Sequence, residues 1–406
     1  MHKLIKDLGV LDRIKNVFVP QKEEIRHDQR SLQVVPAYGS AVGVDSDKAL
    51  TFTAVWAAIR LLSESVASLP ISVYKIDKNG DKIEDVANPI YTLLKYKPNN
   101  YQNKITFFEL LMMNLCTKGE SFFIIQRNNR SALPQQLMPV SNDSVDVIQD
   151  MGSLFYEIDG VTYDADQVLH FKTLTSDGIR GISPIDQCKS SIGWGMALEE
   201  FGNTFFKNGA KLSGVLQTDR QLSETAVERL KQSFNNVYAK LSNSNQTMVL
   251  EEGLSFKPIS ITAEQAQFLA SRTFSVEEIA RIFNIPPHML KDLSKSSFNN
   301  IEMQSQEFVT YTLMPYLTRI EQEMNLKLFR TNELGKSFVK FNVNGLLRGN
   351  TKDRAEFYRT MLNIGAMSIN EVRSKENMNK IEGGDKHVMQ MNMTTIEKIG
   401  EDESVG

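Results

Sequence analysis

The sequence predicts an α+β fold in which an antiparallel sheet is packed against helices. Short segments rich in Phe, Ile and Val follow one another between residues 121 and 172, separated by turn residues, as in antiparallel strands. Longer segments over residues 53–69, 183–209 and 262–284 place apolar side chains at helical spacing. Proline or glycine stands at or shortly after the end of each, where helices stop.

Length and composition are those of a globular protein. At 406 residues the chain is long for one domain, so two or more compact units are expected. A hydrophobic content of 41% and a charged content of 23% are ordinary for a soluble protein. No apolar run approaches the length of a membrane span, and charges interrupt the first residues, so no signal peptide is expected. Cys116 and Cys188 lie in apolar helical patterns, which favours buried thiols in a reducing compartment over a disulfide or a metal site.

The N-terminal part is predicted to be an arm followed by a core helix. Residues 1–18 place Leu, Ile and Phe on one stripe of a helix, for which packing on a neighbour or plain flexibility is favoured over a membrane surface. Residues 19–46 have no clean period, which indicates an arm or linker. The core helix over residues 53–69 ends at Pro70.

Strands and one further helix come next. A strand over residues 71–76 leads to a turn at Asn79-Gly80. Thr106, with Glu109 three residues later, predicts the start of a helix, and Gly119 predicts its end. Further strands are predicted over residues 121–127, 145–149, 155–158 and 167–172.

Two long helices are predicted to enclose a small α/β module. Ser183 and Pro184 suit the N-cap and first turn of a helix that runs to Gly209. Thr262 and Gln265 cap the second helix, which runs to Asn284. The module between them consists of strands near Val215, Met248 and Phe256 and a helix over residues 223–241.

A double proline interrupts the chain after the second long helix. Ser275 and Glu278 also have capping-box spacing, which predicts a helix start there. Pro286 and Pro287 stop this helix, because neither can donate to a helical turn.

A long kinked helix follows a polar loop rich in Ser, Asn and Lys. Apolar residues return at helical spacing over residues 301–328, and Pro315 inside this helix predicts a kink. A strand over residues 337–343 then returns to the first sheet, and helices follow over 351–363 and 369–376. The tail from Glu382 is predicted to be loose, which is favoured over a strand formed by its alternating methionines.

Motifs for catalysis are incomplete. Gly335-Lys-Ser337 ends like a phosphate-binding loop, but Arg330 occupies the position of its first glycine. Gly193-Trp-Gly195 is followed by Leu198 where a dinucleotide fingerprint needs glycine. The five histidines are too scattered for a metal set. The sequence therefore predicts no enzyme, no cofactor and no metal site.

Residues 275–290 support a rival interpretation, a helix-turn-helix regulator that binds DNA. Asn284 replaces the usual turn glycine, and the second helix would offer only His288 and Lys291 to a groove. The chain is also acidic and far larger than such a module requires.

Several short motifs, in one order along the chain, resemble the portal protein of tailed bacteriophages, the head–tail connector ring of the siphophage type. They include Asp177-Gly-Ile-Arg-Gly-Ile-Ser-Pro-Ile185 and Ile285-Pro-Pro-His-Met-Leu290, with others over residues 50–70, 205–210, 249–253, 346–349 and 370–373. The resemblance covers roughly residues 49 to 385. Two departures, Asn350 in place of Asp and Pro98-Asn-Asn100 in place of a second proline, affect local contacts only.

The resemblance implies a portal fold with wing, stem, clip and crown. The wing would combine an antiparallel sheet with helices, including the long kinked helix, the stem two helices, the clip a small α/β module, and the crown helices. The implied ranges are an N-terminal arm 1–48, wing 49–182 and 300–349, stem helices 183–211 and 263–287, clip 212–262, tunnel loop 288–299, crown 350–381 and flexible tail 382–406.

The implied function is structural and non-enzymatic. Twelve subunits would form a ring at one capsid vertex, and double-stranded DNA would be packaged and ejected through its channel. The implied partners are the terminase large subunit, the major capsid protein, the head–tail adaptor and the scaffolding protein, with no membrane. The protein would be made and assembled in the host cytoplasm and reside in the virion.

The implied DNA contact is the tunnel loop. Its channel residues would be Lys291, Ser294, Lys295, Ser296 and Asn299, with Pro286 and Pro287 as the loop hinge and Pro315 as the helix kink. A net charge of −3 per chain, repeated around a ring, favours passage of DNA over retention, because tight binding to phosphates requires positive charge. The alternative is that Lys291 and Lys295 are ordinary loop lysines that never meet DNA.

Overall fold

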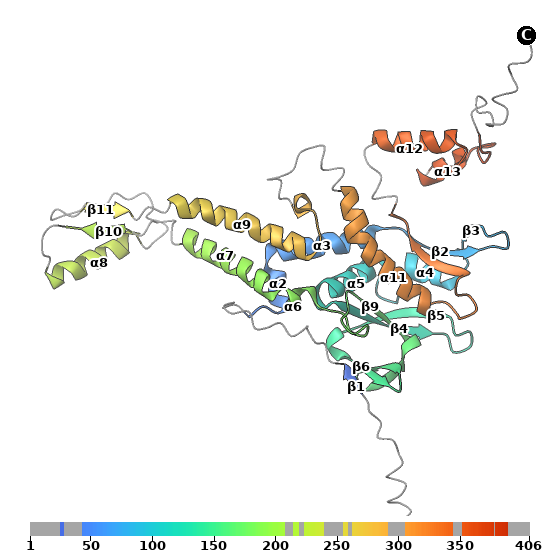
Figure 1. Cartoon of the computed structure of the whole chain (residues 1–406), viewed down its shortest axis with the longest axis horizontal. Helices are drawn as coiled ribbons and strands as arrows, with labels where there is room; N and C mark the ends of the chain where they lie inside the picture. The colour runs from blue at the N-terminus through green and yellow to red at the C-terminus, as the bar shows by residue number, and fades with distance from the viewer. Residues whose placement is uncertain are drawn as a thin grey trace, which may run out of the picture. The chain divides into compact units, whose positions relative to one another are not determined.

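The structure is a computed structural model (Figure 1) that describes residues 25–27, 43–207, 214–218, 223–238, 255–258, 262–290, 305–343, 351–376 and 378–388. The chain forms two compact units, Met1–Phe341 and Asn342–Gly406. Among the predicted elements, the helix over residues 1–18, the strand near Met248 and the alternating methionines from Met389 lie outside the described residues.

The first unit opens with two helices and a small sheet. Helices α2 (Ser46–Thr51) and α3 (Thr53–Ser68) precede strand β2 (Ile71–Ile76). Strand β2 pairs antiparallel with β3 (Lys82–Glu84) on one side and with β12 (Ser337–Phe341) on the other. The predicted core helix, strand and returning strand are thereby confirmed.

Helix α5 (Lys104–Lys118) is the centre of the first unit. The Asn103 side chain accepts a hydrogen bond of 2.9 Å from the Thr106 N–H and caps the helix, so the predicted start at Thr106 was wrong. Gly119 ends the helix in the left-handed conformation, at φ +80°, as predicted. Helix α4 (Pro89–Lys95), which the sequence analysis did not identify, precedes it.

The strands between residues 120 and 172, together with β1, form two further antiparallel sheets instead of the single sheet predicted. One has the order β5-β4-β9 and the other β1-β6-β7-β8. The four predicted strands are present, whereas β1, β5 and β8 were not anticipated. The bounds are β1 Ile25–His27, β4 Glu120–Arg127, β5 Pro134–Val140, β6 Val145–Asp150, β7 Ser153–Ile158, β8 Val161–Asp164 and β9 Val168–Lys172.

Buried side chains join these sheets to the helices. Helix α5 packs against both α3 and β4. Phe107, on α5, and Phe123, on β4, are fully buried, and their ring centroids lie 4.5 Å apart. A second cluster of buried residues joins the two sheets: Phe122, Val145, Val147, Tyr156, Ile158 and Val168. Burial of such rings provides a large part of the stability of the fold.

Two long helices leave this core side by side (Figure 1): α7 (Lys189–Lys207) and α9 (Thr262–Ile282). The predicted single helix over residues 183–209 was wrong, because Cys188 leaves the helical conformation at φ −113° and ψ 21°. This break separates the short helix α6 (Pro184–Gln187), whose buried Ile185 fixes it against the core, from α7.

The segment between α7 and α9 contains the predicted small α/β module. Strands β10 (Gly214–Gln217) and β11 (Ser255–Pro258) pair antiparallel, and helix α8 (Glu224–Tyr238) lies between them in the sequence. In the described parts of the chain, no helix is both long and apolar enough to cross a membrane.

The chain returns to the core through a long helix. It begins near Ser305, passes through a π-helical segment, Phe308–Leu313, and continues as α11 (Met314–Lys327), which packs on β9 and β12.

The second unit contains α12 (Thr351–Asn363) and α13 (Ile369–Lys375), as predicted. Ser368 and Glu371 form a capping box at the start of α13.

Candidate functional site

The C-terminal end of α9 is closed by Asn284. Its backbone adopts the left-handed conformation, with φ +52°. The Asn284 N–H donates to the Arg281 carbonyl over 3.2 Å, and the Ile285 N–H donates to the Ala280 carbonyl over 2.8 Å. This is the Schellman pattern of a helix C-terminus. The helix therefore ends before Pro286, and the prediction that the prolines stop it was wrong in this detail.

The long helix is irregular immediately before Pro315. Pro315 lies in the first turn of α11, directly after the π-helical segment. Because proline has no backbone N–H, the Tyr311 carbonyl four residues earlier cannot receive its usual helical hydrogen bond. The irregularity expected of an internal proline thus takes the form of a wider helical turn on its N-terminal side.

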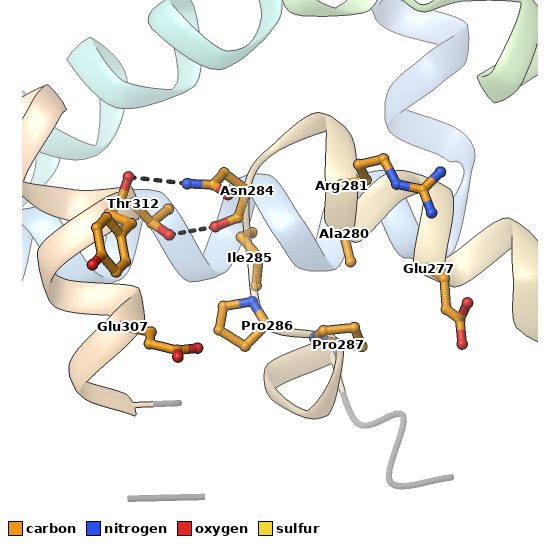
Figure 2. A pocket seen from close by; sticks show the side chains of 10 residues that line it. Glu277, Ala280, Arg281, Asn284, Ile285, Pro286, Pro287, Glu307 and Thr312 are labelled. Atoms are coloured by element: carbon orange, nitrogen blue, oxygen red, sulfur yellow. Dashed lines mark hydrogen bonds between the residues drawn. The ribbon is translucent and has the colours of Figure 1, made fainter. Parts of the chain in front are cut away.

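Asn284 connects these two irregular places (Figure 2). Its side-chain Nδ2 donates to the Tyr311 carbonyl over 3.0 Å, and the Thr312 hydroxyl donates to the Asn284 carbonyl. The amide thus supplies a donor to the carbonyl that Pro315 deprives of one. The end of α9 and the start of the long helix are held together, although residues 284 and 311 are 27 positions apart.

A pocket of about 430 Å³ lies beside this connection. We call it the hinge pocket; Pro286 and Pro287 line it between Glu277, on α9, and Glu307, at the start of the long helix (Figure 2). Nearby, burial lowers the pKa of His288. Its Nδ1 is buried and has no hydrogen-bond partner among the described residues.

The sequence-predicted site residues fall into two groups. Pro286 and Pro287 line the hinge pocket, and Asn284 ties them to the helix that contains Pro315. The five predicted channel residues, Lys291, Ser294, Lys295, Ser296 and Asn299, lie outside the described residues. Asn284 itself was missed as a site residue, because the contact that gives it a role is not local in sequence.

The geometry gives no support to a helix-turn-helix over residues 275–290. Ser275 does not begin a helix but lies inside α9, with only 3% of its surface exposed. In the described part of the chain, a 3₁₀ helix of four residues, Pro287–Leu290, follows the turn. A helix that enters the major groove needs more length than this.

The motif over residues 177–185 joins the core to α6. A Cβ atom on Gly181 would lie 2.1 Å from the Gly119 carbonyl oxygen, and one on Gly119 would lie 2.2 Å from the Ile182 carbonyl oxygen. Both positions therefore require glycine. Ser183 caps α6, as predicted, and its hydroxyl donates to the Thr117 carbonyl over 2.7 Å.

A buried charge cluster lies beside this junction. The fully buried Glu120 carboxylate accepts hydrogen bonds from Arg180 Nε at 3.0 Å, the Gly181 N–H at 3.0 Å and His170 Nε2 at 3.1 Å. His170 Nδ1 lies 3.2 Å from the Tyr156 hydroxyl. These partners fix the tautomer: neutral His170 donates from Nε2 and accepts at Nδ1.

Burial and hydrogen bonding set the charges of the cluster. Burial lowers the pKa of His170 to about 4, so its ring is neutral at pH 7. Burial alone would raise the pKa of Glu120, but the hydrogen bonds from His170 and Arg180 outweigh it and hold that pKa below its usual value. Both ring nitrogens of His170 thus have side-chain partners, as expected of a structural residue.

The incomplete chemical motifs have structural roles. Gly335, at φ +78°, forms a turn that leads into strand β12, whereas a phosphate-binding loop leads into a helix. Gly195 lies within α7, where a Cβ atom would lie 2.5 Å from Ser275 Oγ, so glycine permits close packing on α9. No group of three or more potential metal ligands occurs in the described residues.

Comparisons with known proteins agree on one family. A family model described as phage portal protein matches residues 53–377. The portal protein of Enterobacteria phage HK97 is 31% identical over 398 residues, which cover 96% of this chain and 93% of that protein. A solved HK97-family phage portal protein from Corynebacterium diphtheriae has a TM-score of 0.54 and 17% identity, over 75% of this chain and 98% of that one. A chain in the neck of a native gene transfer agent particle, computed with C12 symmetry, has a TM-score of 0.55 and 19% identity. The match covers 84% of this chain and 96% of that one.

Proposed function

Because this chain belongs to the phage portal protein family and is therefore a portal subunit, we propose that twelve copies form a closed ring at one vertex of the capsid. Double-stranded DNA passes through the channel of this ring during packaging and ejection. The observation that carries the proposal is the family match over residues 53–377, which includes most of the described elements. The C12 symmetry of the neck that contains a chain of the same fold supports the number twelve.

We further propose the assignment of domains within the subunit. The α7–α9 pair is the stem, the module of α8, β10 and β11 the clip, and the unit with α12 and α13 the crown. The sheets, α3, α5 and the long helix make up the wing. The order of these elements along the chain supports the assignment, since a small α/β module interrupts a helix pair.

The tunnel loop over residues 288–299 is proposed to face DNA. Support comes from its base: Asn284 joins the end of α9 to Tyr311 and Thr312, so the chain leaves and re-enters at a fixed place. A loop with a fixed base can present Lys291 and Lys295 at one level of the channel in every subunit. Each contact with phosphate is weak, but the ring repeats it, and weak repeated contacts allow sliding.

The partners follow from the position at the vertex. The clip is proposed to meet the terminase large subunit during packaging and the head–tail adaptor afterwards, and the wing and stem to meet the major capsid protein and scaffolding protein. Assembly takes place in the host cytoplasm. The subunit does not hydrolyse ATP, so packaging depends on the separate motor.

Electron microscopy of the purified protein tests the ring, and a DNA-packaging assay tests the loop. Lys291→Glu/Lys295→Glu should leave rings with a central hole intact but reduce the DNA packaged, because every subunit then repels phosphate. Lys78→Glu/Lys97→Glu is the matched control: both lysines are exposed on other loops, and the charge change is the same. Normal filling by the loop variant would reject the channel contact, and a wild-type monomer would reject the ring.

A further inference from the structure

The second unit exposes many apolar side chains. Among its described residues, Tyr358 is the one apolar side chain that is buried. So small a core gives little stability unless something else covers the apolar surface of the unit. The larger exposed members are Phe357, Ile364, Ile369, Met378, Ile381 and Val388.

Three apolar residues form a line on helix α12. Phe357, Met361 and Ile364 follow one another at positions i, i+4 and i+7, which share one face of a helix. Phe357 is 48% exposed and Ile364 51%, and Met361 is half-buried. The Phe357 ring touches the Tyr358 ring, at a centroid distance of 5.7 Å, yet half of the residue stays in contact with water. We call Phe357, Met361 and Ile364 the α12 stripe.

The other helix of this unit packs on a different face of α12. The Tyr358 hydroxyl donates to Glu376, at the end of α13, over 2.7 Å. Arg354 approaches the same carboxylate, with 3.7 Å between its Nη1 and Oε2 of Glu376. Successive residues of a helix point about 100° apart, so Tyr358 and Phe357 face different sides. The α12 stripe therefore lies beside the contact between α12 and α13, and outside it.

The chain leaves the described part of this unit at one end of the stripe. The His387 ring nitrogen Nδ1 lies 3.0 Å from the Gly365 carbonyl oxygen. A Cβ atom on Gly365 would lie 3.5 Å from the Val388 carbonyl oxygen. Because Gly365 directly follows Ile364, the chain after Val388 starts beside the last member of the α12 stripe.

The next five residues of the chain match the stripe in pattern and in length. Met389, Met391 and Met393 alternate with two polar residues. In an extended chain alternate residues point to the same side, so one side would consist of methionine alone. At about 3.3 Å per residue the three methionines span about 13 Å, and at about 1.5 Å per residue the stripe spans about 10 Å. Methionine side chains are flexible and adapt to irregular apolar surfaces.

We propose that residues 389–393 of the same chain run back along α12 and cover the α12 stripe. We call this segment the methionine strap. Its first residue starts beside Ile364, which gives the strap a high effective concentration at the stripe, an advantage that a separate molecule lacks. The strap is the extended alternative for the tail, with a helix face as the surface that it covers. The contact lies within one subunit and does not depend on the ring.

Fluorescence quenching tests the strap. Phe357→Trp, combined with Trp56→Phe and Trp194→Phe, places the only tryptophan of the chain on the stripe. Acrylamide should quench this tryptophan roughly twofold more strongly when the chain ends at Val388, because about half of the residue at position 357 is then exposed. Equal quenching constants in the full-length and shortened chains overturn the proposal.

Single charges on the strap provide a matched pair of variants in the same background. Met391→Asp turns a carboxylate toward the stripe and should raise the quenching as much as the shortened chain does, because an unpaired charge resists burial. Gln390→Asp adds the same charge to the opposite side of the strap and should leave the quenching unchanged. Equal effects of the two variants contradict the alternation on which the strap depends, and the proposal is then wrong.

Disulfide trapping keeps Phe357 in place and identifies the chain that supplies the strap. Met361→Cys with Met391→Cys, in a Cys188→Ser background, should form a disulfide on oxidation with copper phenanthroline, because the two side chains would face each other. Cys116 is buried and stays out of the reaction. Met361→Cys with Gln390→Cys is the control and should link much more slowly.

A denaturing gel without reductant separates the outcomes. A disulfide within one chain leaves a single-chain band without free thiols at the two positions, as the proposal expects. A band of two linked chains shows that the tail of another copy covers the stripe, and a pair that stays reduced shows that the tail does not reach it. Either of these two results overturns the proposal.

Discussion

Acid should destabilise the first unit through His170. This residue is 2% exposed and lies between Glu120 and Tyr156 as a neutral ring. Burial lowers its pKa from 6.5 to about 4, because a charged imidazole would lose its hydration. Only an anion that does not already pair with another cation could offset that loss in full. The Glu120 carboxylate is already bonded to Arg180.

The sign of the effect follows from this lowered pKa. As pH falls below 6.5, the unfolded chain binds a proton at position 170, whereas the folded chain resists protonation until about pH 4. The stability that neutral His170 contributes is therefore fully present above pH 6.5 and is lost as pH falls below this value. At about 1.4 kcal/mol per pH unit, the loss is about 2 kcal/mol at pH 5. The stabilisation from Glu120 is lost only at still lower pH, because the pKa of its carboxyl group in the folded chain lies below the ordinary value of 4.5.

Urea unfolding of the wild type and of His170→Gln, from pH 7.5 to 5.0, measures this loss. The Gln amide can donate to Glu120 but does not titrate in this range. The variant should be less stable at pH 7.5, and the difference in the free energy of unfolding should shrink by about 2 kcal/mol by pH 5.0. The other four histidines are present in both proteins, so they do not contribute to the difference. Parallel curves would refute the assignment of the proton to His170.

Two further predictions concern backbone positions. Gly119→Ala and Gly178→Ala introduce the same backbone strain, at φ +80° and +79°, but only at Gly119 does backbone lie within 4 Å of the new Cβ. In urea unfolding, Gly119→Ala should therefore lower the free energy of unfolding by about 1–3 kcal/mol more than Gly178→Ala does. Equal losses would contradict the close approach at Gly119. Asn284→Gly keeps the left-handed turn but removes the side-chain donor, and should cost about 1 kcal/mol. In a Pro315→Ala background, which restores an N–H donor near the Tyr311 carbonyl, the cost should fall, and additive losses in the double-mutant cycle would reject the coupling.

Local signals in the sequence predicted most helices and strands correctly. Ser183 before Pro184, and Ser368 with Glu371, cap helices in the structure as their spacing indicates. Gly119 ends α5 for the same reason: its left-handed conformation is accessible to glycine without steric cost. Such signals need only neighbouring residues, so one sequence suffices to find them.

Packing between distant segments overrode other local signals. Ser275 has the spacing of a capping box with Glu278, yet it lies within α9 because its side chain packs against Gly195 of α7. The break at Cys188 depends likewise on how Ile185 is buried against the core. The buried cluster of Glu120, His170 and Arg180 joins residues up to 60 positions apart, and no sequence period encodes such a contact.

Asn284 shows how one residue can satisfy a local and a distant requirement together. Asn284 departs from the helix-turn-helix pattern, in which glycine is usual at the turn. Glycine would also adopt the left-handed conformation that ends α9, but it would leave the Tyr311 carbonyl, which Pro315 deprives of its helical donor, without the side-chain bond that Asn284 makes. Asparagine tolerates the same conformation and also supplies that donor. The irregular helix at Pro315 and the turn at Asn284 are therefore one structural feature, and together they fix the base of the loop proposed to meet DNA.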